Sequence, residues 1–364
     1  MSFKLPFRYL EPTFYAGLLD DPILIIRIRP WGKSLMVDCG QNYQVAKRVF
    51  KSVTAVFISH AHMDHFMGMD KFARSVLVSP KTIDLFGPPG ISAKLAMRLQ
   101  GYDWNLVESN YCTFQAHDVY PDYLDHYQLA GAHGFSSSEI GKSPLEGREI
   151  YRNRFLKAES VICDHKIPVL CFKFTERGAF IIDEEKIEKK GLVKGEWLKE
   201  LKRQFYNEEL GKKPLKILQR QGEKQRETVI ERTDLLFEEI TKETPPLSIG
   251  YISDIGFSLE NQEKVFSLMK GVNLLFCECT YLKEDQAKAR KSGHLCTDDV
   301  NRIVDEIKPQ FLVPMHLSKT YMNESSRLFE ELKIPTDCSL IRLPERITPE
   351  PLLPCQVDLL KSFI

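Results

Sequence analysis

A dense group of metal-binding side chains, His60-Ala-His62-Met-Asp64-His65, comes directly after the apolar run 55–58. Imidazole nitrogens and a carboxylate this close together suit borderline divalent metals such as zinc. A loop at the end of a strand can point alternate side chains in opposite directions, so His60 and His62 can meet at one metal while Asp64 and His65 reach a second about 3.5 to 4 Å away. The spacing therefore suggests a pair of metal ions.

Two metal ions need more ligands than this loop supplies, and three residues elsewhere are candidates. His165 precedes the apolar run 168–174, Asp254 ends the run 248–253, and His316 ends the run 311–315. Ligands in open α/β sheets gather at the carboxyl ends of buried strands. Taken singly, an Asp after a strand is often a turn residue and a lone His is more often packed than a ligand, so only the joint pattern supports a metal site.

Short apolar runs alternate with stretches of helical spacing along most of the chain, which favours layered α/β structure over an all-β sandwich. The predicted strands are 23–28, 34–37, 55–58, 76–78, 169–174, 179–182, 247–252, 274–276 and 311–313. The predicted helices are 42–51, 92–99, 259–269, 297–307 and 324–332. We therefore expect helices on both faces of a sheet and one domain over residues 1–364.

One segment departs from this rhythm and carries most of the charge asymmetry. The formal net charge of the chain is zero, yet residues 186–226 hold thirteen Lys or Arg against six Glu. The surrounding stretch 186–243 is rich in Lys, Glu and Gln and poor in β-branched residues, so we predict an inserted, basic, helical arm. Clustered cations could bind a polyanion such as nucleic acid, and the alternative is a solvated surface insertion.

The remaining composition excludes several classes of protein. No apolar run approaches the roughly 20 residues that span a bilayer, and the first residues lack the apolar stretch of a secretory signal. The nine cysteines are an odd number without a paired framework, and Cys277 and Cys279 suit core packing better than a structural zinc site. We expect a cytoplasmic protein that does not enter the membrane.

The motifs together resemble the metallo-β-lactamase superfamily and, within it, the ribonuclease Z branch of tRNA 3′-processing endonucleases. Beside the histidine loop, the similarity is carried, in family order, by Val37-Asp-Cys-Gly40, Phe86-Gly-Pro-Pro-Gly90, Asp164-His165, Cys277-Glu-Cys-Thr-Tyr281, Gly293-His294 and Met315-His-Leu-Ser-Lys-Thr-Tyr321. The resemblance implies an αββα sandwich with an inserted basic helical arm, and a metal-dependent hydrolase that cleaves a phosphodiester, with a precursor tRNA 3′ end as substrate.

The resemblance also implies a role for each ligand. His60, His62 and His165 would hold one metal, Asp64, His65 and His316 the other, and Asp254 would bridge both. Asp38 would orient the histidine loop, as metal-bound imidazoles need a fixed outer partner. The two ions are expected to be Zn²⁺, although His and Asp ligands also admit Mn²⁺ or Fe²⁺.

Beyond the ligands, the family's catalytic loops are similar to Glu278 and His294. A hydroxide held by both metals would attack phosphorus, with Asp64 among the catalytic groups, and the leaving 3′-oxygen would need a proton. We hypothesise that His294 gives this proton and that Glu278 orients it. The alternative is that His294 is only a turn residue after Gly293.

The inserted segment stands where ribonuclease Z carries its tRNA-binding arm, and Gly191-Leu-Val-Lys-Gly-Glu-Trp197 resembles the family's arm motif. Lys and Arg side chains there would bind tRNA phosphates without regard to sequence. The RNA-binding candidates are Lys194, Lys199, Lys202, Arg203, Lys212 and Lys213.

Several positions depart from the family pattern. The family's glycine-rich opening loop is absent, and residues 13–21 stand in its place. The arm has Gly195-Glu where Gly-Pro is usual, the last motif reads Ser318-Lys-Thr-Tyr321 where Ser-x-Arg-Tyr is common, and Cys277 stands where a histidine is frequent. The ligands are kept while the residues that would contact the substrate differ, so the chain resembles a divergent member of the family.

Two other functions stay open. One is a hydrolase of the same fold acting on a small phosphodiester or ester, against which the basic arm argues. The other is a catalytically silent RNA-binding module, against which the complete ligand set argues. The resemblance also suggests a homodimer, and His117, His126 and His133 match no family position and receive no role.

Overall fold

The computed structural model describes residues 5–178, 180–221, 224–242 and 245–347. They form two compact units. Of the described residues, the larger unit comprises 10–150, 159–173 and 248–347, and the smaller comprises 5–9, 151–158 and the described part of 174–247. The predicted arm, 186–243, lies within the smaller unit.

The first sheet of the larger unit has eight strands in sequence order. The strands β1 to β3 pair antiparallel at one end of the sheet and β6 to β8 pair antiparallel at the other, whereas β3 to β6 run parallel. Its strands are β1 (Leu10–Phe14), β2 (Leu24–Ile28), β3 (Lys33–Val37), β4 (Val53–Phe57), β5 (Thr82–Gly87), β6 (Thr113–Val119), β7 (Tyr123–Ala130) and β8 (Ser137–Pro144). The central strand β4 is almost fully buried, as expected for a strand covered on both faces.

The second sheet has seven strands in the order β18-β17-β16-β15-β11-β10-β9. The strands β15 to β18 run parallel, so their carboxyl ends lie at one edge. The strands of this sheet are β9 (Glu149–Arg152), β10 (Leu156–Asp164), β11 (Pro168–Glu176), β15 (Ser248–Ile252), β16 (Leu274–Glu278), β17 (Phe311–Met315) and β18 (Ser339–Leu340).

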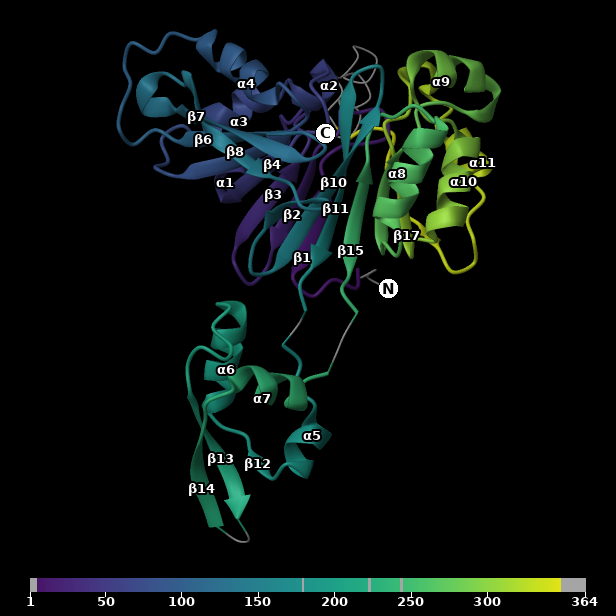
Figure 1. The fold of residues 1–364 in the computed structure, drawn as a ribbon. Helices are drawn as coiled ribbons and strands as arrows, with labels where there is room; N and C mark the ends of the chain where they lie inside the picture. Colours follow the sequence, from purple (N-terminus) through teal and green to yellow (C-terminus); the bar gives the residue numbers. More distant parts are fainter. Residues whose placement is uncertain (1–4, 179, 222–223, 243–244, 348–364) are drawn as a thin grey trace, which may run out of the picture. The chain divides into compact units, whose positions relative to one another are not determined.

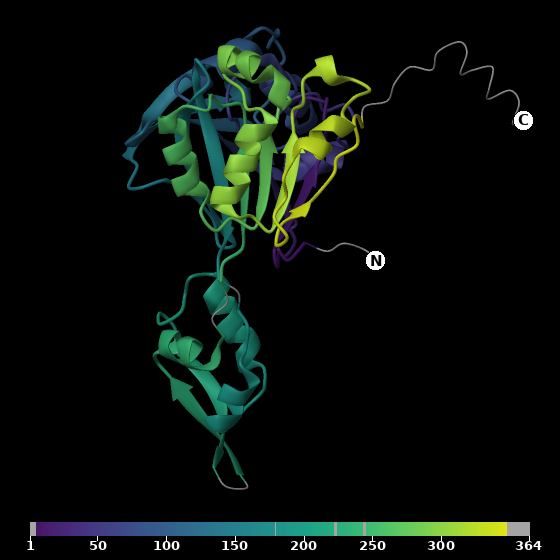
Figure 2. The same cartoon turned by 90° about the vertical axis from the view of Figure 1, so that its right-hand side faces the viewer.

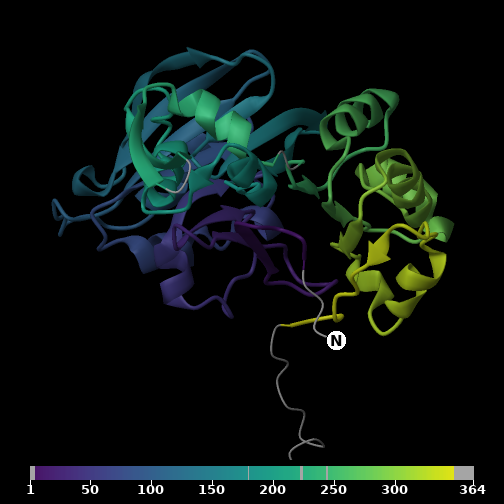
Figure 3. The same cartoon turned by 90° about the horizontal axis from the view of Figure 1, so that it is seen from below.

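Helices cover the outer faces of both sheets (Figures 1 and 3). Beside the first sheet lie α1 (Lys47–Ser52), α2 (Met63–Phe66), α3 (Met69–Val76) and α4 (Ile91–Gln100). Beside the second lie α8 (Leu259–Met269), α9 (Gln286–Ser292), α10 (Thr297–Ile307) and α11 (Ser326–Glu331). Short 3-10 turns occupy Gly131–His133, Lys283–Asp285 and Lys319–Tyr321. This arrangement is the αββα sandwich that the sequence predicted.

Aromatic side chains join the inner faces of the two sheets. Phe57 of β4 stacks on Phe86 of β5 at 5.2 Å and meets Phe172 of β11 edge-on at 5.7 Å between ring centroids. Phe14 of β1 contacts Phe276 of β16 at 5.5 Å. Edge-on and offset ring pairs of this kind add to the hydrophobic gain of burying the rings.

The smaller unit contains three helices and a sheet of three antiparallel strands (Figure 2). Its elements are α5 (Glu184–Lys189), β12 (Leu192–Val193), α6 (Trp197–Tyr206), β13 (Leu215–Gln221), β14 (Lys224–Ile230) and α7 (Thr233–Ile240). A core of its own, including Trp197, Leu201 and Ile217, packs the helices against the hairpin.

Three expectations about local structure were wrong or incomplete. Residues 76–78 do not form a strand, because Val76 ends α3 and packs in the core with Phe72. The described part of 179–182 makes only an isolated bridge at Ile182, and residue 179 lies outside the described residues. The arm is helical only in part: residues 215–221 form the strand β13, in which Leu215 and Ile217 are buried on either side of the exposed Lys216.

The part of the chain that the structure describes includes no helix long and apolar enough to cross a membrane.

Truncating Phe172 tests the aromatic contact between the sheets. Phe172→Ala should lower the free energy of unfolding of the larger unit by about 3 to 5 kcal/mol, because it removes a fully buried ring and leaves a cavity. Urea unfolding followed by near-ultraviolet circular dichroism would measure the change. Leu259→Ala, at a position 74% exposed, is the matched control and should leave the midpoint nearly unchanged; a similar midpoint for both variants would contradict the packing described above.

Candidate metal centre

The histidine loop begins two residues after β4, and Asp38 holds it in place. Asp38 is fully buried and accepts hydrogen bonds from the Ser59 backbone N–H (2.7 Å) and hydroxyl (2.9 Å) and from the Tyr251 hydroxyl (2.8 Å). The same carboxylate lies 2.8 Å from His65 Nδ1, which leaves the Nε2 of His65 directed away from it. Asp38 therefore fixes both the orientation of His65 and the contact between the two sheets at this point.

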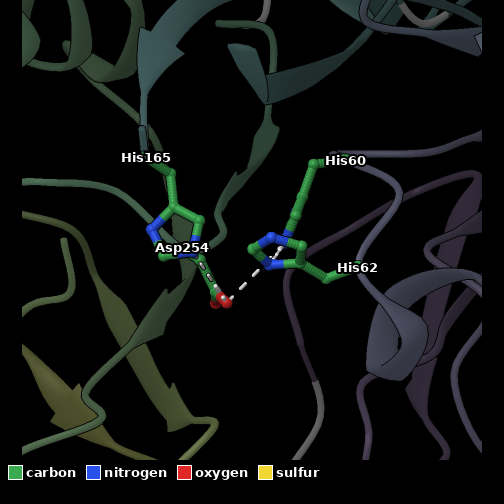
Figure 4. Close-up of side chains that lie close together, drawn as sticks. All are labelled: His60, His62, His165 and Asp254. Atoms are coloured by element: carbon green, nitrogen blue, oxygen red, sulfur yellow. Dashed lines mark hydrogen bonds and ion pairs between the residues drawn. The ribbon is translucent and has the colours of Figure 1, made fainter. Parts of the chain in front are cut away.

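The first ligand group brings together His60, His62, His165 and Asp254 (Figure 4). One nitrogen or oxygen atom of each lies within 4.8 Å of the others. Asp254 Oδ2 is 3.8 Å from His60 Nε2 and 3.9 Å from His165 Nε2, and His60 Nε2 is 3.0 Å from His62 Nδ1. The Nδ1 of His165 donates to the Gly293 carbonyl at 2.6 Å, which leaves its Nε2 free to act as a ligand.

The second group brings together Asp64, His65, Asp254 and His316. His316 Nε2 lies 3.1 Å from Asp64 Oδ2, and His316 Nδ1 lies 3.3 Å from Asp254 Oδ1. His65 Nε2 lies 3.4 Å from Asp254 Oδ2. Asp254 belongs to both groups, so the structure places it where a residue bridging two metal ions would stand.

A third group places Glu278 and His294 beside Asp254 and His316. Glu278 Oε2 is 3.1 Å from His294 Nδ1, and Glu278 Oε1 accepts the Ile255 backbone N–H at 2.8 Å. Burial opposes protonation of His294, but the adjacent Glu278 carboxylate outweighs burial and raises the pKa of His294 to about 9. An imidazole that keeps its proton at neutral pH can serve as a general acid.

Gly293 links this third group to the first. It follows α9 with φ of +81°, a left-handed backbone conformation that residues other than glycine rarely adopt. A Cβ on Gly293 would also approach His165 Nδ1 to 3.2 Å. Glycine at this position therefore allows the carbonyl to hold His165 while the next residue, His294, reaches Glu278.

The donor atoms fit divalent metal ions. Among the described residues, His65 Nε2 and Asp254 Oδ1 are buried side-chain atoms that make no hydrogen bond, although buried polar atoms normally have a partner. Burial and the neighbouring His65 imidazole lower the pKa of His60, so its nitrogen lone pair is available to a metal. The surrounding imidazoles outweigh burial and hold the pKa of the Asp254 carboxyl well below its usual range.

Within the described part of the chain, the other histidines and the cysteines belong to none of these three groups. His117 and His126 face each other across β6 and β7, with 2.7 Å between their Nδ1 atoms, and His133 lies in a 3-10 turn. Cys277 and Cys279 are buried in the hydrophobic core beside α8 and α10, as expected for packed thiols.

Thr280 is part of the motif 277–281 that carries the resemblance, but the sequence predicted no role for it. Its hydroxyl lies 2.6 Å from Glu278 Oε2, 3.2 Å from His294 Nδ1 and 3.2 Å from His316 Nδ1. The hydroxyl therefore links the loops that carry Glu278, His294 and His316. Tyr251, which binds Asp38, gave no signal because it lies inside an apolar run.

Comparisons with known proteins extend this description. A family model described as Anti-Pycsar protein Apyc1 matches residues 23–117. The ribonuclease Z of Deinococcus radiodurans is 28% identical over 293 residues, which cover 79% of this chain and 83% of that protein. The ribonuclease Z of Nanoarchaeum equitans is 23% identical over 327 residues, covering 88% and 84%. The solved structure of human tRNase Z, short form, is 14% identical with a TM-score of 0.49 and covers 92% of this chain and 98% of that chain.

The ligand-rich edge of the two sheets and the similarity to ribonucleases Z support a metal-dependent hydrolase built on an αββα sandwich. Within that class, the chain is similar to ribonuclease Z over most of its length.

Neutralising Asp38 tests the support of the histidine loop. Asp38→Asn should weaken metal binding about 10- to 100-fold, because the amide no longer provides the anionic partner of His65 Nδ1. Metal content after dialysis against graded chelator would measure the change, with Asp103→Asn, an exposed carboxylate, as the control. Equal metal retention in both variants would show that Asp38 does not support the ligands.

Proposed function

We propose that this protein is a phosphodiesterase with two divalent metal ions and that its substrate is RNA, specifically the 3′ end of precursor tRNA. The observation that carries the proposal is the convergence of His60, His62 and His165 on one side of Asp254 and of Asp64, His65 and His316 on the other. The similarity to ribonucleases Z supports the choice of RNA. We assign Zn²⁺ to both positions, since nitrogen-rich ligand sets favour it.

The residues around this centre suit the in-line displacement of a phosphodiester. When bound, the two ions stabilise negative charge on the phosphoryl oxygens and activate the attacking water. His294 holds a proton on its ring and donates it to the leaving 3′-oxygen. Glu278 and Thr280 lie 3.1 and 3.2 Å from His294 Nδ1, which leaves Nε2 to give the proton.

The proposed RNA-binding surface needs revision within the smaller unit. Of the six cations expected to bind RNA, four form ion pairs with glutamates: Lys194 with Glu184, Lys199 with Glu196, Arg203 with Glu200, and Lys213 with Glu209. Lys202 lies 6.0 Å from the ring centroid of Tyr206, and Lys212 is exposed. Exposed pairs are weak and a phosphate can displace the glutamate, but the local positive potential is reduced.

The hairpin β13–β14 offers better placed cations. Lys216, Arg220, Lys224 and Arg226 are exposed, and none of them forms an ion pair within the described part of the chain. Arg220 and Arg226 line a shallow pocket with Gln219 and Thr228. We therefore place the phosphate contacts of the arm chiefly on this hairpin, with Lys202 and Lys212 beside it.

The substrate can be tested directly. The metal-loaded protein should cleave a 3′-extended tRNA precursor and also hydrolyse bis-p-nitrophenyl phosphate, and chelation should abolish both activities. Cleavage of the small ester alone would favour the alternative, a hydrolase of a small phosphodiester. Absence of both activities from the metal-loaded protein would refute the proposal.

His294 should act on the leaving group and not on the metal. His294→Ala should lower kcat for the RNA about 100- to 10,000-fold, the usual contribution of a general acid, and leave metal content unchanged. Bis-p-nitrophenyl phosphate is the internal control: its acidic leaving group needs no proton, so its hydrolysis should fall much less. Loss of metal would make His294 a ligand, and an unchanged kcat for RNA would remove it from the mechanism.

Two charge-matched variants can locate the RNA contacts. Replacing Lys216, Arg220, Lys224 and Arg226 together with Ala should weaken RNA binding and lower the slope of log K against log salt by about 3 to 4. Replacing the ion-paired Lys194, Lys199, Arg203 and Lys213 removes the same charge and should change the slope by less. Hydrolysis of bis-p-nitrophenyl phosphate should stay the same in both variants. A larger effect of the second set would show that RNA binds at the ion-paired cations on and beside α6 and not at the hairpin.

A further inference from the structure

One carboxylate near the metal centre has no role in the function described so far. Asp21 lies in segment 17–22, which occupies the place of the family's glycine-rich opening loop. Its side chain is half-buried, and it is in none of the three ligand groups. Among the described residues, no hydrogen bond or ion pair of the Asp21 carboxylate is present.

The backbone fixes segment 17–22 between the loop that carries His316 and the loop after β3. Leu18 accepts a hydrogen bond from the N–H of Leu317, the residue after His316, at 2.8 Å. On the other side, Pro22 accepts one from Gly40 at 3.1 Å, and the N–H of Cys39, next to Gly40, donates to the His65 carbonyl at 2.8 Å. The segment therefore contacts the His316 loop directly and the histidine loop through residues 39 and 40.

The neighbouring Asp20 explains why Asp21 is held firmly. Asp20 is buried, and its Oδ2 accepts the backbone N–H groups of Gly17 at 2.9 Å and Ile347 at 2.7 Å. This carboxylate is thus committed to holding the segment together. Asp21, one residue further on, has no such structural task.

Close packing at Gly40 places Asp21 beside Asp64. A Cβ on Gly40 would lie 2.6 Å from the Asp21 Cβ and 2.3 Å from the Asp64 carbonyl oxygen, so both residues abut the same α-carbon. The charges of Asp64, His65, His316 and Lys319 are all near enough to influence Asp21. Asp64 is also the most exposed of the ligands that face Asp21, with 39% of its side chain accessible, so this side of the centre is open to a substrate.

The chemistry of a phosphodiester limits what Asp21 can bind. A carboxylate repels the non-bridging phosphate oxygens and can accept hydrogen bonds only from a donor. In a ribonucleotide chain the donor nearest to the 3′-phosphate is the 2′-hydroxyl on the adjacent carbon, which is also the group that distinguishes RNA from DNA. Lys319, exposed and on the same side, has the opposite charge and suits the phosphate.

We propose that Asp21 is a specificity residue that accepts a hydrogen bond from the ribose 2′-hydroxyl next to the scissile phosphate. This inference rests on the proposed phosphodiesterase function. It gives the enzyme a preference for ribonucleotides that is separate from binding by the arm. Asp21 contributes to recognition and takes no part in the proton transfer assigned to His294.

The test uses a pair of small substrates, the dinucleotide uridylyl-(3′→5′)-uridine and its analogue without the first 2′-hydroxyl, because in both the bond broken is the P–O3′ bond to the ribose that Asp21 would contact and neither depends on tRNA. The metal-loaded wild-type protein should favour the ribose compound in kcat/KM by about 10- to 100-fold, the range for a hydrogen bond to a charged group, after correction for uncatalysed cyclisation. Asp21→Ala should bring this ratio close to one by slowing only the ribose substrate. Asp21→Asn, which keeps an acceptor oxygen, should retain part of the preference.

Hydrolysis of bis-p-nitrophenyl phosphate, which has no hydroxyl, separates the possible failures. It should stay within about twofold of wild type in Asp21→Ala, as in the control Asp103→Ala, because no hydrogen bond to a ribose is lost. A ribose-to-deoxyribose ratio that Asp21→Ala leaves unchanged would overturn the inference while the phosphodiesterase function stands. A parallel loss of metal and of activity on all three substrates would also overturn it, making Asp21 a support of the ligands. If the wild-type protein hydrolyses none of the three, the proposed function itself fails.

Discussion

The site depends above all on one buried carboxylate, Asp38. Its two oxygens meet Ser59 and His65 from the first sheet and Tyr251 from the second. A fully buried charge is costly unless several donors surround it, so these groups must all be in place together. The hydrogen bonds that orient His65 therefore also fix how the edges of the two sheets meet. The positions of Asp254 and His316, which come from the second sheet, follow from that contact.

The sequence predicted which side chains would lie together because several of them follow a strand. His60, Asp254 and His316 come after β4, β15 and β17, whose apolar runs are plain in the sequence. Parallel strands bring their carboxyl ends to one edge, which accounts for the proximity of Asp254 and His316; His60 comes from the other sheet, so its place beside them depends on how the two sheets meet. The candidate His165 precedes a strand instead, in the tight turn between β10 and β11.

Other features could not be read from the sequence. The strands β6, β7 and β8 mix polar and apolar residues and gave no clear period, and the hairpin β13–β14 was mistaken for helix since its charged residues also suit helices. The unpartnered state of Asp21 and the ion pairs of the arm depend on which side chains meet in space. A count of charges in 186–226 showed an excess of cations but could not show which of them face glutamates.

The position of Asp254 between the two ligand groups has a consequence for how the protein matures. The ligands that share it come from chain positions as far apart as His60 and His316, and from both layers of the sandwich. Neither half of the larger unit offers all the members of either group, so a newly made chain must assemble both sheets before it could retain metal there. Metal affinity would then include the free energy of closing the sandwich, and a bound ion would stabilise the contact between the two layers. When metal is scarce in a cell, the packing of the two sheets against each other would therefore be slower or less stable. This defect would appear before any loss of secondary structure within either sheet.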